Sequence, residues 1–282
     1  MMQIVDTHQH LWDLDLLSYS WTARSPHFNR SFRLSDYAEA TQGIEVIKSV
    51  HVEADIDEPD MLAETRYILG LAERDDNPIT GVVAAARPEY EGFREYVEQI
   101  AGHPNLKGLR RILHVVPDDV STTPLFAENI RTLEGYGLSF DICVLARQLP
   151  LAINLVKQCP NVSFILDHCG NPDIKNRNYK AWREGMAQLA SYPNVLACKI
   201  SGIVVNTDIP NWTVEDLRPA VEGVIETFGW DRVMFGSDWP VCTLAASFKH
   251  WLEALSFLTK DAGEENRQKL FRENAERVYR LS

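Results

Sequence analysis

Three features that define other classes of protein are scarce or missing in this sequence of 282 residues. Its five cysteines are widely scattered and lack C-x-x-C spacing, which excludes a disulfide framework and a zinc knuckle and predicts buried, reduced thiols at Cys143, Cys159, Cys169, Cys198 and Cys242. No apolar run approaches the roughly 20 residues that cross a membrane, and the start lacks a basic segment followed by an apolar one. We therefore expect a cytoplasmic protein.

Basic residues are also outnumbered, with 28 Lys and Arg against 40 Asp and Glu, for a net charge of −12. No block of consecutive basic residues offsets this balance, which repels phosphate backbones and anionic lipid. We therefore expect neither nucleic acid nor a membrane as partner, but a small molecule. The charge gives no rule about how many chains associate.

No linker, charge block or low-complexity segment divides the chain, so we expect a single domain over residues 1–282. Short apolar and β-branched runs recur at the spacing of a βα unit, and each is followed by an amphipathic segment. Eight such runs predict a (β/α)8 TIM barrel, an α/β fold. They occupy residues 3–8, 46–54, 79–86, 106–113, 138–144, 162–168, 195–202 and 232–238.

Helix signals fall between these runs. Thr123 and Pro124 are typical of an N-cap and first helical position, and Gly135 and Gly137 lie at the far end of the same segment. Helical periodicity also runs through residues 60–74, 91–101, 147–158, 213–228 and 264–280. An open doubly wound sheet is the alternative, but no G-x-G-x-x-G follows the first strand, so we favour the barrel.

Polar residues at the carboxyl ends of barrel strands form the active sites of this fold. The first strand ends in His8-Gln9-His10, and because side chains alternate along a strand, both imidazoles point the same way and can chelate one metal ion. Two hydrogen-bonded surface histidines are the alternative. The sixth strand ends in Asp167-His168, of which we expect only His168 to enter the barrel mouth, with Asp167 capping the following turn.

The eighth strand ends near Gly236, and Pro240 stops it, which leaves Asp238 at the rim. A carboxylate there can bind metal or take a proton from water, although an Asx-turn acceptor is the alternative. The joint occurrence of histidines after strands one and six and an aspartate after strand eight favours an active site.

Other polar strand ends complete the expected pocket. We predict substrate contacts from Glu53, Arg110, His114, Asp141 and Lys199, and from the rings of Trp21 and Trp239, which could equally be core aromatics. His51, Arg87 and Ser201 also end strands, and Arg87 could serve only to cap carbonyls. Lys199 lies in a buried strand and needs a partner, which a carboxylate such as Asp141 would supply.

Several motifs together resemble the amidohydrolase superfamily, and more narrowly its sugar-lactonase branch of L-fucono- and L-rhamnonolactonases, which is related to 2-pyrone-4,6-dicarboxylate lactonase. These motifs extend from Asp6 to Leu281 and read V-D-T-H-Q-H, L-D-H-C-G, C-K-I-S-G, F-G-S-D-W-P-V and E-N-A-E-R-V-Y-R-L. The resemblance implies a metal site at His8, His10, His168 and Asp238. A second metal would need a Lys or Glu after strand four and a His after strand five, where this chain has Arg110 and Asp141. We expect at most one divalent ion, Zn²⁺, and the branch resemblance implies that activity does not require it.

The resemblance implies hydrolysis of a sugar lactone to the sugar acid. In this hypothesis His8, His10 and His168, alone or through one metal ion, stabilise the oxyanion. Asp238 takes a proton from water and later returns it to the leaving alkoxide, so that Asp238, His168 and His10 are the catalytic residues. Two alternatives remain open at this point: a decarboxylase on the same scaffold, and a sugar-acid binding protein without turnover.

Overall fold

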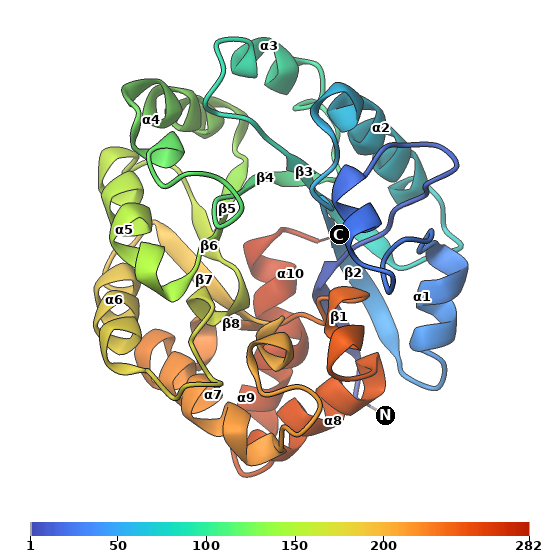
Figure 1. Cartoon of the computed structure of the whole chain (residues 1–282), viewed down its shortest axis with the longest axis vertical. Helices are drawn as coiled ribbons and strands as arrows, with labels where there is room; N and C mark the ends of the chain where they lie inside the picture. The colour runs from blue at the N-terminus through green and yellow to red at the C-terminus, as the bar shows by residue number, and fades with distance from the viewer. Residues whose placement is uncertain (1, 282) are drawn as a thin grey trace.

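Eight parallel strands lie side by side in chain order and form the barrel that the apolar runs predict (Figure 1). The structure is a computed structural model and describes residues 2–281. Each strand coincides with one predicted run, although β1 extends one residue beyond its run, to Gln9, and this confirms the (β/α)8 fold. The strands are β1 (Ile4–Gln9), β2 (Val46–Val52), β3 (Ile79–Ala85), β4 (Leu106–Ile112), β5 (Ser139–Cys143), β6 (Phe164–Leu166), β7 (Val195–Ile200) and β8 (Val233–Phe235).

The first and last strands close the barrel through a few specific bonds. The Thr7 hydroxyl donates to the Phe235 carbonyl at 2.7 Å, and the Asp238 amide donates to the His8 carbonyl at 2.7 Å. A parallel bridge joins Gln9 to Trp239 just beyond β8. The ends of β1 and β8 are therefore neighbours, although 228 residues separate His10 from Asp238.

Helices form the outer ring (Figure 1). The Thr123 hydroxyl accepts from the Phe126 amide at 3.2 Å, which confirms the predicted N-cap of α4. The predicted periodic stretches contain α2, α3, α5, α7, α9 and α10, whereas α1, α6 and α8 lie outside the ranges predicted. The helices are α1 (Leu34–Ala40), α2 (Met61–Ala72), α3 (Phe93–Glu98), α4 (Pro124–Arg131), α5 (Leu149–Gln158), α6 (Lys180–Ala190), α7 (Val214–Phe228), α8 (Phe248–Leu258), α9 (Glu264–Gln268) and α10 (Asn274–Val278).

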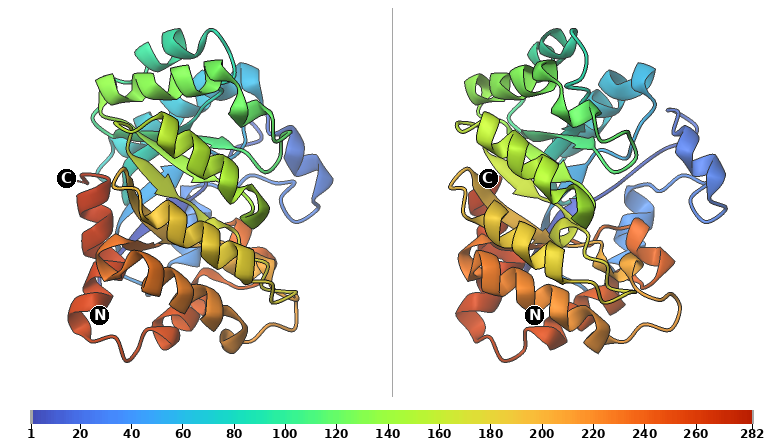
Figure 2. Two further views of the ribbon diagram at one scale, coloured as in Figure 1. Left: turned by 90° about the vertical axis from the view of Figure 1, so that its left-hand side faces the viewer. Right: turned by 60° about the vertical axis from the view of Figure 1, so that its left-hand side comes forward.

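The two ends of the barrel are covered by different segments (Figure 2). Helix α10 lies at one end, where Val278 and Leu281 pack against side chains inside the barrel such as Val5 and Ile165. The segment between β1 and α1, which includes a short helix over Ser20–Arg24, extends from the opposite end. The second end is the one to which the carboxyl ends of the strands point.

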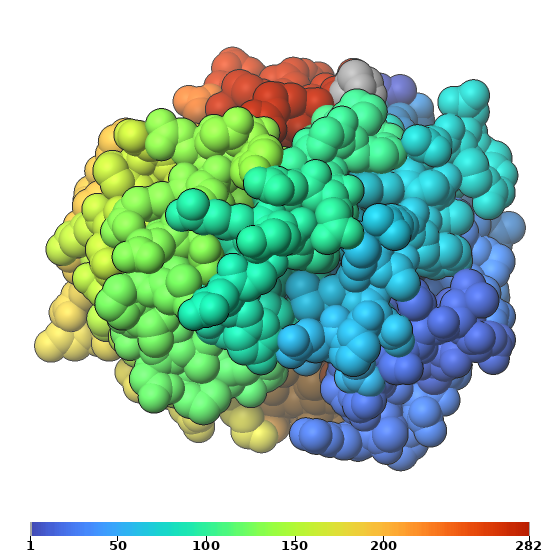
Figure 3. Space-filling model, turned by 90° about the horizontal axis from the view of Figure 1, so that it is seen from above, coloured from blue at the N-terminus to red at the C-terminus, as the bar shows by residue number. Residues whose placement is uncertain are grey.

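The outer helices cover the strands. On the face shown in Figure 3, the chain from α2 to α5, coloured cyan to light green, forms a continuous wall.

All five cysteines are buried and free, which confirms that they are core residues. Within residues 2–281, no helix combines the length and apolar character needed to span a bilayer.

Candidate active site

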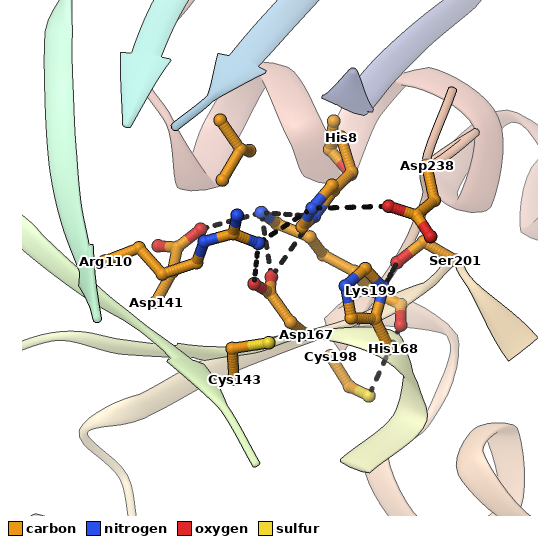
Figure 4. Close-up of polar contacts among 12 residues, drawn as sticks. His8, Arg110, Asp141, Cys143, Asp167, His168, Cys198, Lys199, Ser201 and Asp238 are labelled. Atoms are coloured by element: carbon orange, nitrogen blue, oxygen red, sulfur yellow. Dashed lines mark hydrogen bonds and ion pairs between the residues drawn. The ribbon is translucent and has the colours of Figure 1, made fainter. Parts of the chain in front are cut away.

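The side chains that end β1, β6 and β8 meet at the carboxyl end of the barrel (Figure 4). The rings of His8 and His168 lie 4.4 Å apart, and those of His8 and His10 lie 4.9 Å apart. Asp238 Oδ1 lies 3.2 Å from His10 Nε2 and 3.8 Å from His8 Nε2. The structure therefore brings together the four residues that the strand ends and the resemblance single out.

A buried carboxylate ties the ends of β1 and β8 together. Asp6 accepts from the backbone amides of His8 and Ser237 at 3.1 and 2.8 Å, and also from the hydroxyls of Ser237 and Tyr37. These donors satisfy a charge that would otherwise be costly to bury. Asp6 thus fixes the backbone that carries His8 and Asp238.

The hydrogen bonds of His10 leave one nitrogen facing a carboxylate. Nδ1 lies 2.7 Å from the Val52 carbonyl, which can only accept, so Nδ1 carries the hydrogen. In the neutral imidazole Nε2 then carries a lone pair, and it faces the carboxylate oxygen of Asp238 at 3.2 Å. Two acceptors this close require a proton or a cation between them.

The end of β6 corrects one expectation from the sequence. Asp167 does not cap the following turn; its fully buried side chain points into the barrel together with that of His168. Strand alternation fails here because β6 ends at Leu166 and the backbone leaves the extended region after Asp167, with φ of 53° at His168 and 56° at Cys169. Both side chains therefore reach the site.

Close packing around His168 depends on a glycine. Ser201 Oγ lies 2.9 Å from His168 Nδ1, and the adjacent Gly202 has φ of 64°. A Cβ at Gly202 would lie 2.5 Å from His168 Nδ1 and 2.9 Å from Asp238 Oδ2. Any side chain at Gly202 would therefore displace one of these groups or move the loop after β7.

A network of buried charges lies beneath the histidines (Figure 4). Lys199 Nζ lies 2.7 Å from Asp141 Oδ2 and 3.0 Å from Asp167 Oδ1, which confirms the predicted partner of the lysine. Arg110 pairs with Glu53 at 2.8 Å and with Asp167 at 3.3 Å. Although burial opposes ionisation, Lys199 and His8 hold the pKa of Asp167 well below its usual range.

The depth of this network corrects three predicted substrate contacts. Asp141 and Lys199 are 0% exposed and Glu53 is 1% exposed, and none of them lines the cavity above. The carboxylate of Glu53 is already bonded to Arg110 and to the Asp55 amide. Side chains buried this far down the barrel support the site and do not touch a ligand in it.

A cavity of about 350 Å³ opens above the network. Predicted residues that line it include Trp21, Arg110 and His114, as well as His10, His168 and Asp238. Trp239 is a core aromatic instead, 3% exposed and packed against Phe32 and Tyr37. The sequence reading missed other polar residues of the lining, Asp55, Asn171 and Asn206; their positions after β2, β6 and β7 were the available signal.

Two further strand-end residues lie outside this cavity. Arg87 donates to the backbone carbonyls of Ala86 and Ile56 at 2.9 and 3.3 Å, which is the capping role considered for it. His51 is buried at 1% exposure with Nε2 3.4 Å from the Leu11 carbonyl, and burial lowers its pKa to about 3. Neither side chain is available to a ligand in the cavity.

The site keeps several imidazoles neutral. Burial lowers the pKa of His8 well below its usual value and also lowers that of His168, although Asp167 opposes both shifts. Burial, assisted by the neighbouring His168 ring and the Arg110 guanidinium, lowers the pKa of His114 to about 4. At neutral pH these rings therefore act as hydrogen-bonding groups or metal ligands and not as cations.

Two overlapping groups of side chains could hold a metal ion: His8, His10 and Asp238, and His8, Asp167 and His168. The first group fits a cation, because His10 Nε2 and Asp238 Oδ1 face each other as acceptors. Asp167 Oδ1, which also pairs with Lys199, lies 3.4 Å from His8 Nδ1, where it can orient a metal-binding imidazole. The Arg110 guanidinium lies 3.1 Å from His8 Nε2, and its positive charge repels a cation bound there. The residues therefore fit one ion, and Arg110 weakens its binding.

Comparisons with known proteins agree with this geometry. The family model described as Amidohydrolase matches residues 5–281. An uncharacterized protein, y4mH, from Sinorhizobium fredii is 30% identical over 99% of this chain and 98% of its own. An L-fucono-1,5-lactonase from Burkholderia ambifaria is 28% identical over 98% of this chain and 95% of its own. The crystal structure of an amidohydrolase from Burkholderia multivorans with bound zinc is 27% identical, has a TM-score of 0.89 and covers 100% of both chains.

Proposed function

Because this chain belongs to the amidohydrolase family, we propose that it is a lactonase that opens a sugar lactone to the sugar acid. The observation that carries the proposal is the meeting of the Asp238 carboxylate with the imidazoles of His10 and His168 at one cavity. The L-fucono-1,5-lactonase similar to this chain over nearly its whole length supports the substrate class.

Lactone hydrolysis needs a nucleophilic water, a stabilised oxyanion and a proton for the departing ring oxygen. Asp238 takes a proton from water as the water oxygen attacks the lactone carbonyl. The tetrahedral oxyanion accepts hydrogen bonds from His168 and Arg110, both of which line the cavity. When the ring C–O bond breaks, Asp238 returns its proton to the leaving alkoxide, so the carboxylate is regenerated and water is consumed.

The rest of the lining suits a polyol. Trp21 offers a ring face, and its Nε1 is bonded to the Ala54 carbonyl at 2.8 Å, which fixes the ring's position. Asp55, Asn171 and Asn206 add acceptors and donors for hydroxyl groups. A site that can hydrogen-bond many hydroxyls discriminates strongly against analogues that lack them.

His8, His10 and Asp238 would hold a divalent ion, and the related amidohydrolase with bound zinc supports zinc as its identity. Such an ion would polarise the lactone carbonyl and strengthen the acidity of a bound water. The protein groups described above supply the proton transfer and the hydrogen bonds in either case.

A panel of aldonolactones of both ring sizes, assayed with a pH indicator in weak buffer, tests the function. We expect acid release from at least one six-carbon sugar lactone. Acid release from none, with ligand binding alone, would refute hydrolysis and leave a binding protein; release of CO₂ from an aromatic acid would instead establish a decarboxylase.

The Asp238→Asn variant tests the catalytic assignment. It removes the base but keeps the shape of the side chain, so kcat should fall by about 10³-fold or more while KM changes by less than about fivefold. Asp75→Asn, at an exposed position between α2 and β3, is the matched control and should keep wild-type kcat. Retention of half the wild-type kcat in Asp238→Asn would rule out this role.

A further inference from the structure

A tyrosine from the last helical segment reaches the buried charges under the site. Tyr279 is 1% exposed, and its hydroxyl donates to Asp141 Oδ2 at 2.7 Å. The same oxygen accepts from Lys199 Nζ at 2.7 Å. The ammonium group also lies 5.3 Å from the centre of the Tyr279 ring, within the range of a cation–π contact. Tyr279 therefore acts on Lys199 both directly and through Asp141.

Lys199 in turn lies against His8. Its Nζ is 3.3 Å from His8 Nδ1, and Asp167 Oδ1 is 3.4 Å from the same nitrogen (Figure 4). An ammonium can only donate to Nδ1, whereas a carboxylate can only accept from it. The position of Lys199 between Asp141 and His8 therefore affects which ring nitrogen of His8 carries the hydrogen.

The other side of the His8 ring shows which tautomer the site needs. Arg110 Nη1 lies 3.1 Å from Nε2 and can only donate, so it requires a lone pair there. The hydrogen then belongs on Nδ1, where it faces Asp167 Oδ1 at 3.4 Å, a buried carboxylate oxygen that also pairs with Lys199 Nζ at 3.0 Å. This tautomer directs the Nε2 lone pair toward Arg110 and Asp238.

We propose that Tyr279 is a positioning residue: together with Asp141 it holds the Lys199 ammonium away from His8 Nδ1, and so keeps His8 in the tautomer with hydrogen on Nδ1. The distances agree with this role, since Lys199 Nζ lies 2.7 Å from Asp141 and 3.0 Å from Asp167 but 3.3 Å from His8 Nδ1. The terminal segment that closes the far end of the barrel thus contributes to the geometry of the site. The kinetic consequence rests on the proposed lactonase function, but the tautomer does not.

Tyr279→Phe tests the proposal by removing only the hydroxyl. The readout is the ¹⁵N spectrum of ring-labelled histidine in metal-free protein at one fixed pH, in which the two nitrogens of a neutral imidazole have distinct shifts that report the tautomer. The His8→Gln variant assigns the His8 signals. We expect a single Nδ1–H form in the wild type and a substantial Nε2–H population in Tyr279→Phe. An unchanged His8 tautomer in a folded Tyr279→Phe protein would overturn the proposal.

Two controls separate positioning from general loosening. Tyr96→Phe also removes a tyrosine hydroxyl, one that donates to the Ala85 carbonyl at 2.9 Å, and should leave the His8 signals unchanged. Ser139→Ala removes a more distant donor, 3.4 Å from the other oxygen of Asp141, and should have the same null effect. A tautomer shift in either control equal to that in Tyr279→Phe would also overturn the proposal.

Kinetics provide the second readout. On a lactone substrate, Tyr279→Phe should lower kcat about tenfold and leave KM within twofold, because the cavity lining does not include Tyr279. A rise in KM with unchanged kcat would contradict the positioning role. If the wild type hydrolyses no lactone, the proposed function fails, while the tautomer measurement still decides the role of Tyr279.

Discussion

Glu64→Gln is expected to stabilise the protein increasingly as the pH rises. Glu64 lies on α2 at 1% exposure, where its Oε1 accepts from the Tyr19 hydroxyl at 2.9 Å and from the Ala54 amide at 3.4 Å. Burial, reinforced by the nearby charge of Glu53, raises the pKa of Glu64 from 4.5 to about 8. Glutamine keeps the acceptor oxygen and cannot ionise, so it removes the cost of a buried charge.

The sign and size of the effect follow from proton linkage. Between pH 4.5 and about pH 8 the folded protein retains a proton on Glu64 that the unfolded chain releases. The stabilisation by this proton is complete below pH 4.5 and is lost as the pH rises to about 8. A pKa shift of this size corresponds to roughly 5 kcal/mol at most. We expect the free energy of unfolding of Glu64→Gln to exceed that of the wild type by about 2–5 kcal/mol at pH 9 and by less than about 1 kcal/mol at pH 5.

Urea unfolding at pH 5, 7 and 9 measures this difference. The control, Glu98→Gln, makes the same change at the exposed end of α3 and should follow the wild type at every pH. The m-value should stay constant, so that changes in midpoint report stability. A difference between Glu64→Gln and wild type that does not grow from pH 5 to pH 9 would refute the assignment of a buried, protonated Glu64.

Gly202→Ala should lower kcat at least about 100-fold while the protein still folds, since its Cβ would lie 2.5 Å from His168 Nδ1 and the strain costs about 1–3 kcal/mol; kcat above half the wild-type value would contradict this packing. Trp21→Ala should raise KM about tenfold with little loss of stability, whereas Trp239→Ala should lower the free energy of unfolding by about 3–5 kcal/mol. The reverse pattern would show that the two rings have been assigned wrongly. Zinc added to metal-free protein should raise the melting temperature of the wild type but not of His10→Gln, and equal shifts would place the ion elsewhere.

The sequence predicted the barrel well because parallel strands covered on both faces must be almost continuously apolar. Each of the eight strands coincides with a predicted run, and only β1 extends beyond its run, by one residue. Helices such as α6 and α8 were not assigned residue ranges, although each buries a tryptophan, Trp182 and Trp251. Their apolar positions are separated by more polar residues than those of the strands, so they gave a weaker signal.

The sequence also predicted which strand ends converge, but not how deep each side chain lies. Lys199 was correctly paired with Asp141, because a lysine between apolar residues in a strand requires a carboxylate. The distance of Lys199 from the cavity depends on how the strands are staggered relative to one another around the barrel, and the sequence of one strand does not specify this stagger. Trp21 and Trp239 show the same limit. Both lie next to loops that the sequence predicts at the mouth of the barrel, yet only Trp21 lines the cavity.

The chain by itself determined the repeating β and α units and the placement of histidines and an aspartate at the ends of strands one, six and eight, because side-chain periodicity and strand length are local properties. Only the tertiary structure decided that Asp167 turns inward with His168, that Asp141 and Lys199 lie below the cavity, and that Tyr279 reaches them from the last segment. These arrangements depend on left-handed backbone at the end of β6 and on barrel closure, which bring into contact residues as far apart in the chain as Asp141 and Tyr279, separated by 138 positions, and His8 and Lys199, separated by 191.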